Sequence, residues 1–243
     1  MREIAAKTIE DTVYRLILEA SCRIGDDVQA AVRQAYESEP APAGRNVLMQ
    51  LLQNYDIARQ ERIAICQDTG MCVIFLEIGQ DVHISGDLRE AVDAGVRKGY
   101  TEGYLRKSVV RDPLDRVNTG DNTPAMLYTE LVPGDRVKIT VAPKGFGSEN
   151  MSQIKMLKPS DGLQGVKDFI LKVVEDAGPN PCPPIVVGVG LGGTFDKAAY
   201  LAKKALMRPL DQRNPQPFYA ALEQELLEMI NALGIGPQGF GGQ

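Results

Sequence analysis

The 243 residues are 44% hydrophobic, which is enough apolar material to build a packed core in one large domain or two small ones. The 27 basic and 32 acidic residues leave a formal net charge of −5, so the chain lacks the positive field that attracts a nucleic-acid backbone, and we expect no nucleic-acid partner. Charged residues stand where a signal peptide needs an apolar core, and no stretch approaches the roughly 18 apolar residues of a membrane span, so we expect a cytoplasmic protein without membrane contact.

The N-terminal quarter is predicted to form two or three helices. Apolar residues recur at steps of three and four between positions 4 and 58, as on the buried face of a helix. Residues 39–44 interrupt the pattern, because proline and glycine favour turns. A β-branched apolar run over 71–78 predicts a strand, and Asp87 marks the start of a helix that continues to residue 100.

The middle of the chain is predicted to be a β-hairpin. Residues 125–132 and 136–142 have strand character, and Pro133-Gly134-Asp135 stands between them as a turn. Beyond it we expect helices over residues 161–177, 195–207 and 217–233, with a short buried strand at 185–189. This order indicates a single α+β domain, in which N-terminal helices pack on a mixed sheet with a β-hairpin and further helices follow towards the C-terminus.

Four cysteines in a chain without a secretion signal argue against a disulfide framework. Cys22, Cys66, Cys72 and Cys182 are therefore thiols or metal ligands, and free cysteine is usually a small buried hydrophobe. The absence of paired Cys-x-x-Cys or Cys-x-x-His spacing disfavours zinc. The only histidine, His83, has no neighbouring serine or cysteine that would indicate nucleophilic catalysis.

Four polar segments are candidates for a functional site. Residues 66–70 combine a thiol, an amide and a carboxylate at the start of a buried strand, where unsatisfied polar groups cost free energy. Residues 104–124 are rich in arginine and asparagine, and guanidinium groups bind carboxylates. Glycines in residues 144–150 would let backbone N–H groups approach an anion, and Cys182 is held among prolines. The simpler alternatives are a capped turn for 66–70 and a solvated surface loop for 104–124.

A glycine motif late in the chain supports an alternative of another class. Gly188, Gly190 and Gly193 have the G-x-G-x-x-G spacing of a dinucleotide-binding turn, between a predicted strand and a predicted helix. The residues before Asp211, the candidate ribose-binding carboxylate, look like a loop and not like the second strand of such a unit. A non-catalytic nucleotide-binding module, or an assembly module, thus remains open.

Taken together, the polar segments resemble the class I fumarate hydratases. The resemblance runs in order along nearly the whole chain, and its motifs are residues 66–70, 105–113, 122–124, 144–150, 181–184 and 190–197. Within that family the chain resembles the α subunit of two-subunit members, which include fumarases and L(+)-tartrate dehydratases.

The resemblance implies a hydro-lyase that reversibly hydrates fumarate to (S)-malate, or alternatively an L(+)-tartrate dehydratase α subunit. Family members hold a [4Fe–4S] cluster through three cysteines, and its open iron coordinates the substrate. Because such clusters require thiolates, the resemblance implies Cys66 and Cys182 as two cluster ligands. The resemblance assigns no catalytic base within this chain. The substrate-binding residues that it implies are Gln67, Asp68, Arg106 and the loop glycines Gly145 and Gly147.

The resemblance also implies partners and further chain. In the family, a substrate-contacting histidine and the third cluster cysteine follow the stretch that matches residues 239–242, so we expect the domain 1–243 to be truncated at its C-terminus. Cys22 and Cys72 match no ligand position and are expected to be buried thiols. We expect a small dicarboxylate substrate, a β subunit that carries the base, and a homodimer formed through the α chain. Alone, the chain is expected to be inactive.

Overall fold

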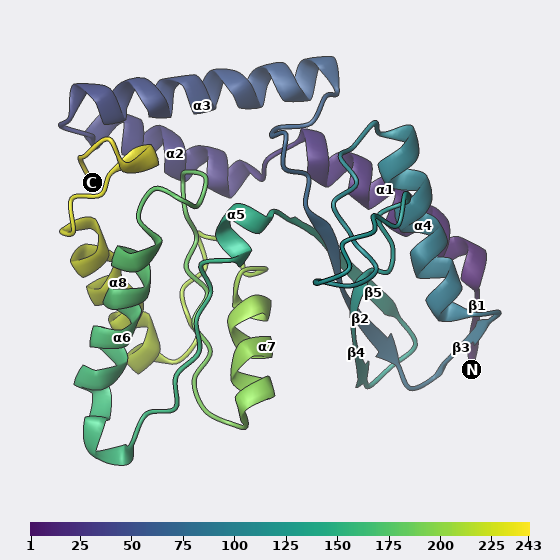
Figure 1. Ribbon diagram of the computed structural model, residues 1–243. Helices are drawn as coiled ribbons and strands as arrows, with labels where there is room; N and C mark the ends of the chain where they lie inside the picture. The colour runs from purple at the N-terminus through teal and green to yellow at the C-terminus, as the bar shows by residue number, and fades with distance from the viewer. The chain divides into compact units, whose positions relative to one another are not determined.

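The computed structural model describes every residue from Met1 to Gln243, and the chain folds into two compact units (Figure 1). The first unit consists of Met1–Ile24 and Tyr55–Phe146, and the second of Gly25–Asn54 and Gly147–Gln243. Each unit takes two stretches of the chain, so no single cut in the sequence separates them. Helices occur together with a mixed sheet, which confirms the expected α+β class.

The first unit is built on a three-stranded sheet with the order β4-β2-β5 (Figure 1). The central strand β2 (Met71–Gly79) runs parallel to β4 (Met126–Val132) and antiparallel to β5 (Val137–Lys144). Nearly every residue of β2 is buried, whereas the residues of β4 and β5 are partly buried or exposed. A continuous apolar run is typical of a strand that is covered on both faces, and β2 is also paired along both of its edges.

The predicted hairpin is wrong in its pairing. Both strands form where they were expected, but each pairs with β2 and neither pairs with the other. The turn between them crosses the end of β2, where Gly79 N donates to Arg136 O at 2.8 Å and Gln80 N donates to Val132 O at 2.9 Å. Strand patterns and turn residues are local features, whereas the insertion of β2 between two strands that follow each other in sequence is a long-range event.

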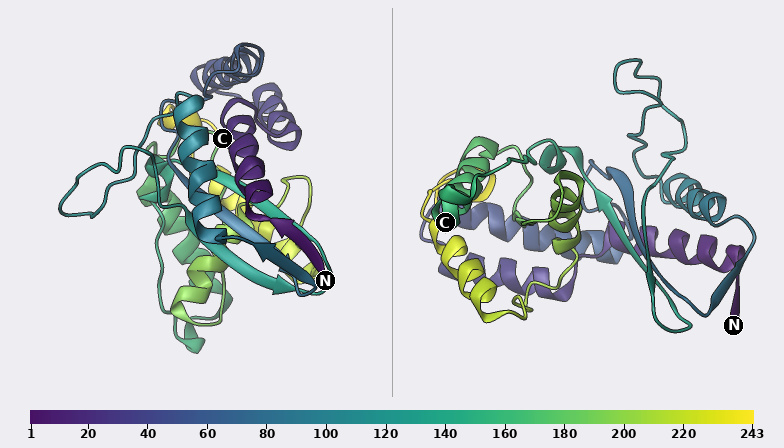
Figure 2. Two further views of the ribbon diagram at one scale, coloured as in Figure 1. Left: turned by 90° about the vertical axis from the view of Figure 1, so that its right-hand side faces the viewer. Right: turned by 90° about the horizontal axis from the view of Figure 1, so that it is seen from below.

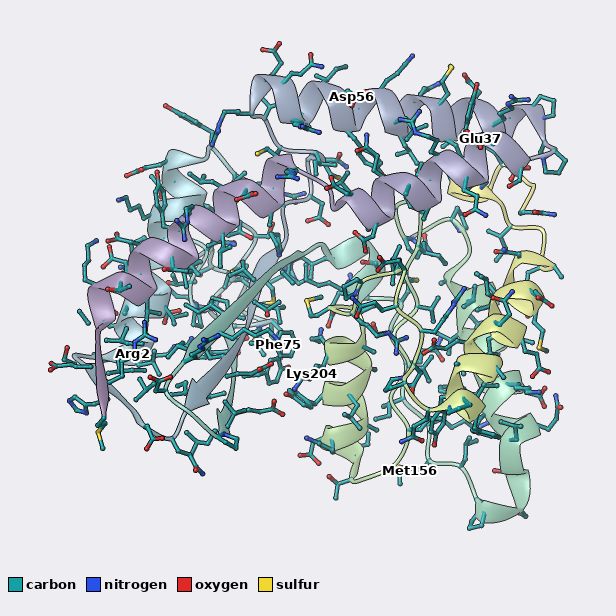
Figure 3. All side chains as sticks on the ribbon, turned by 180° about the vertical axis from the view of Figure 1, so that it is seen from behind. Arg2, Glu37, Asp56, Phe75, Met156 and Lys204 are labelled. Atoms are coloured by element: carbon teal, nitrogen blue, oxygen red, sulfur yellow. The ribbon has the colours of Figure 1, made fainter.

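Helices α1 (Ala6–Cys22) and α4 (Leu88–Glu102) lie side by side on one face of this sheet (Figure 2). Asp87 caps α4 by accepting a hydrogen bond from Glu90 N at 3.0 Å, as the sequence predicted. The other face carries Phe75 (Figure 3). Its ring stacks on that of Tyr128, with 5.2 Å between the centroids. The core between the helices and the sheet contains Ile9, Val13, Ile17, Cys72, Ile74, Leu76, Val92, Val96 and Tyr100.

Two short strands were missed by the sequence analysis. Strand β1 (Arg2–Ala5) pairs in parallel with β3 (Val82–Ser85), so the first helix begins at Ala6 and not at residue 4. Strands of four residues contain too few alternations for the period of two to be recognised.

The second unit is helical. It contains α2 (Asp26–Ser38), the first part of α3 (Pro42–Glu61), α5 (Phe146–Glu149) from Gly147 onwards, α6 (Gly162–Ala177), α7 (Phe195–Ala205), α8 (Pro217–Asn231) and the 3-10 turns Pro159–Asp161 and Pro237–Gly239. The predicted helices at 161–177, 195–207 and 217–233 are confirmed as α6, α7 and α8. Helices α6 and α8 pack through Ile170, Leu222 and Leu226. None of the helices in the chain combines the length and the apolar composition that crossing a membrane requires.

The predicted strand at 185–189 is wrong. This segment has no strand partner and runs beside α7. A Cβ atom on Gly188 would lie 2.3 Å from Ala202 O, and one on Gly190 would lie 2.1 Å from Ala198 O. The glycines therefore have a packing role, because only a residue without a side chain fits against the backbone of α7. Without a preceding strand, the G-x-G-x-x-G spacing lacks the context that a dinucleotide site needs.

Candidate functional site

Residues 66–70 form a tight turn directly before β2, and Asp68 holds it. Asp68 Oδ1 accepts a hydrogen bond from Gly70 N at 3.1 Å, and Asp68 Oδ2 accepts one from Phe146 N at 2.8 Å. Gly70 has φ +59°, and a Cβ atom added there would lie 2.0 Å from Lys144 O. The turn is capped, as the simpler reading of the sequence expected, and the same contacts place Asp68 beside Gly145.

Cys66 is partly exposed in this turn. Its sulfur accepts a hydrogen bond from Asp68 N at 3.4 Å, and its thiol donates one to Gln67 Oε1 at 3.3 Å. Hydrogen bonds to cysteine sulfurs are also found where such sulfurs ligate metal clusters. Cys66 thus has the exposure and the donor that suit a metal ligand.

The two cysteines without a ligand assignment differ from each other. Cys72 is buried, as expected, and burial raises the pKa of its thiol to about 12, so it stays protonated at neutral pH. Cys22 is only partly buried, which corrects the expectation of a fully buried thiol, and its Sγ donates to Leu18 O at 3.1 Å. That bond to the preceding helical turn explains why a thiol is tolerated near the surface.

The loop between α4 and β4 carries Arg106. The beginning of this loop is bonded to the 66–70 turn, because Thr69 Oγ1 donates to Arg106 O at 2.9 Å. The Arg106 side chain is exposed and makes no ion pair. The middle of the loop projects next to α4 (Figure 2), as the expectation of a solvated surface loop implies. That expectation is wrong for the end of the loop near β4, where Asn122 is fully buried.

Asp121 stabilises the returning end of this loop. Its carboxylate accepts hydrogen bonds from Arg97 Nε at 2.9 Å and from Thr123 N and Oγ1 at 3.0 and 2.7 Å. Burial alone would raise the pKa of Asp121, but the bonds from Thr123 and the Arg97 guanidinium outweigh burial and lower the pKa to about 2.

We expect Asp121→Asn to change the pH dependence of stability. Because the folded-state pKa lies below the usual 3.8, the ionised carboxylate stabilises the fold above about pH 4, and this stabilisation is lost as the pH falls towards 2. The pair is partly exposed and therefore screened, so the contribution is below about 1 kcal/mol. Urea unfolding of both proteins at pH 6 and near pH 2.5 measures it. A difference between them that is equal at the two pH values would contradict the linkage.

Gly147 and Cys182 lie in the second unit. Cys182 is exposed and follows the buried Pro181. A Cβ atom on Gly147 would lie 3.2 Å from Asn180 O, so the glycine loop approaches the backbone just before Cys182. From the C-terminal segment, Gln238 Nε2 donates to Pro179 O at 3.2 Å. Within this unit, the residues near Cys182 therefore collect from three separate stretches of sequence.

The structure divides the residues implied by the resemblance between the two units. It places Cys66, Gln67, Asp68, Arg106 and Gly145 in the first unit and Gly147 and Cys182 in the second. Two residues that tie the first group together, Thr69 and Tyr100, were not singled out from the sequence. Tyr100 contributed only to a helical pattern, and nothing local in the sequence indicates that its hydroxyl reaches the turn.

Known proteins similar to this chain cover nearly all of it. Residues 10–243 match the family model described as fumarate hydratase (Fumerase). A Methanocaldococcus jannaschii protein, provisionally named L(+)-tartrate dehydratase subunit alpha, is 44% identical over an alignment of 241 residues that covers 96% of this chain and 84% of that protein. The L(+)-tartrate dehydratase subunit alpha of Escherichia coli (strain K12) is 32% identical over an alignment of 245 residues that covers 99% of this chain and 80% of that protein. The chain therefore belongs to the class I fumarate hydratase and tartrate dehydratase family, as its motifs indicated.

Proposed function

We propose that this chain is the α subunit of a [4Fe–4S]-dependent hydro-lyase that adds water to, or removes it from, a small dicarboxylate. Membership of the family supports the hydro-lyase class. The observation that supports a particular site is the hydrogen bond from Thr69 to the backbone of Arg106. It connects the turn that contains Cys66 to a residue with an exposed guanidinium that has no ion-pair partner. The thiol of Cys66, the amide of Gln67 and the guanidinium of Arg106 are thus attached to connected backbone segments, and these groups suit the binding of a metal and of a carboxylate.

The cysteines fit part of a cluster site. Cys66 and Cys182 are both accessible, and Cys66 has a backbone donor at its sulfur. No group of three or more His, Cys, Asp or Glu side chains that could hold a metal ion is present in the structure. Two thiolates do not complete a ligand set of three, so in the proposal a further thiolate comes from outside residues 1–243.

The chain's own residues would bind and orient the substrate. Arg106 can bind a carboxylate with two parallel N–H donors, and the Gln67 amide can donate to an oxygen beside it. Both Asp68 oxygens accept backbone N–H groups, so within the turn Asp68 holds Gly70 and Phe146 in place. When bound, the cluster would supply a Lewis-acidic iron that makes hydroxide a better leaving group. In the proposal the base belongs to the β subunit.

The two candidate hydroxy acids, (S)-malate and L(+)-tartrate, differ by one hydroxyl. Hydration of fumarate to (S)-malate is the first candidate and agrees with the description of the family model. Dehydration of L(+)-tartrate is the second, and the names of the relatives at 44% and 32% identity favour it. Discrimination of an added hydroxyl depends on the polar groups that face it, and those groups include residues of the β subunit.

The test is reconstitution of the complete α–β enzyme from its two subunits with iron and sulfide, without oxygen. We expect hydro-lyase activity on fumarate or L(+)-tartrate that requires both subunits, and no activity from the α chain alone. The ratio of kcat/KM for the two acids assigns the substrate. Size-exclusion chromatography of the α chain, with and without the β subunit, tests the proposed α–α dimer and the α–β complex. A reconstituted, iron-containing complex that acts on neither acid would refute the proposal.

A further inference from the structure

We infer that Thr69, Tyr100 and Asn122 are positioning residues that hold Arg106 and the 66–70 turn in one fixed arrangement. The inference rests on the proposed function, in which Arg106 and Gln67 bind the substrate. Thr69 bonds directly to Arg106 O, and the bond from Tyr100 fixes Thr69. Asn122, near the end of the loop that carries Arg106, bonds to Ser108 and Val109 near its beginning.

The Asn122 side chain connects its own segment of the loop to two other backbone segments. Its side-chain oxygen accepts hydrogen bonds from Ser108 N at 2.6 Å and Val109 N at 3.0 Å. Its side-chain nitrogen donates to Gly70 O at 3.1 Å. Asn122 is fully buried, so the amide has no water to replace these partners. A single side chain thereby links the residues that follow Arg106 to the last residue of the 66–70 turn.

Thr69 and Tyr100 close the arrangement from the other side. Thr69 Oγ1 donates to Arg106 O at 2.9 Å, and the Tyr100 hydroxyl donates to Thr69 O at 2.8 Å. The Tyr100 side chain is fully buried, and this burial is the main cause that raises the pKa of its phenol. Tyr100 therefore remains a hydrogen-bond donor at neutral pH. Helix α4 thus holds the turn, and the turn holds the backbone of Arg106.

These bonds specify geometry more than stability. A buried polar group gives little net stabilisation even when it is fully hydrogen-bonded, whereas apolar side chains of similar size would stabilise a core at least as well. The three buried polar side chains bond to the 66–70 turn and to the beginning of the loop that follows α4. From there the charged side chain of Arg106 extends into solvent. A fixed backbone below an exposed cation is the arrangement that a binding site requires, because binding groups must be held within about 0.5 Å of the geometry that fits the ligand.

Thr69→Val removes one bond of the arrangement with little change of shape. In the reconstituted α–β enzyme we expect the KM for the dicarboxylate to rise about tenfold while kcat changes less than about threefold, because Arg106 binds substrate and transition state alike. Hydrogen exchange of the backbone amides at 105–109, measured on the α chain by mass spectrometry, is expected to become faster. Thr69→Ser keeps the hydroxyl and should restore both properties.

The matched control is Thr119→Val. Thr119 Oγ1 also donates to a backbone carbonyl of this loop, Val109 O, at 3.3 Å, but it does not contact the 66–70 turn. We expect its KM to stay at the wild-type value. Asn122→Asp is the second variant: it keeps an acceptor for Ser108 N and Val109 N but turns an oxygen towards Gly70 O, so faster exchange is expected at 105–109.

The two measurements separate the inference from the proposed function. Unchanged exchange in Thr69→Val and Asn122→Asp would overturn the inference, whether or not the enzyme is active. Faster exchange with an unchanged KM would also overturn it, because the loop would then be held for a reason other than Arg106. A wild-type complex without hydro-lyase activity would refute the proposed function, and exchange at 105–109 would still decide whether these residues hold the loop.

Discussion

Cys66→Ser is expected to remove iron from the complete α–β enzyme and to abolish its activity. A serine oxygen is a poor substitute for a thiolate in an iron–sulfur cluster, so one ligand of the proposed set is lost. Activity should fall by at least about 100-fold, since even outer-shell changes at metal sites cost 10–100-fold. Cys182→Ser should have the same effect. Iron and sulfide analysis after anaerobic reconstitution, together with the visible absorption of the cluster, measures the loss without reference to activity.

Cys22→Ser is the matched control for both substitutions. Cys22 is partly exposed like Cys66, but its sulfur donates to Leu18 O within α1, and a serine hydroxyl can make the same bond. Iron content and activity should therefore remain at the wild-type level. Full iron content in Cys66→Ser or Cys182→Ser would show that the replaced residue is not a ligand, and equal losses in all three variants would indicate a general effect of thiol removal.

Gly70→Ala is expected to destabilise the chain by about 2–4 kcal/mol, the largest stability effect that we predict. Two costs add. The left-handed φ of +59° disfavours any residue with a Cβ atom, at about 1 kcal/mol. In addition, the new Cβ would lie 2.0 Å from Lys144 O and 2.2 Å from Lys144 C, which are backbone atoms of β5 that cannot rotate away. Urea unfolding of the α chain, followed by circular dichroism, measures the change.

Gly120→Ala separates the two costs. Gly120 also has a positive φ, +82°, but no atom lies within 4 Å of the Cβ position. Only the conformational cost of about 1 kcal/mol is expected there. Equal destabilisation by the two substitutions would show that the turn and β5 can separate without loss, contrary to the close approach of Gly70 and Lys144. Gly70→Ala should also lower activity, because Gly70 O accepts the bond from Asn122.

The sequence alone determined the features that depend on neighbours along the chain. Helices α4, α6, α7 and α8 were predictable because a period near 3.6 is visible over three or more turns, and the Asp87 cap follows from residue type and position. The order of motifs from Cys66 to Gly193 was enough for the family, since motif order does not depend on the pairing of strands.

The tertiary structure decided everything that depends on which segments meet. Strand β2 pairs with β4 along one edge and with β5 along the other, and the pattern of each single segment does not indicate which strands pair. Residues 185–189 have strand composition, but they pack against α7 through Gly188 and Gly190 and find no strand partner. The Thr69–Arg106 and Asn122–Gly70 bonds join residues 37 and 52 positions apart. Such bonds depend on the helix and the sheet that bring the turn and the loop together, so no local pattern in the sequence indicates them.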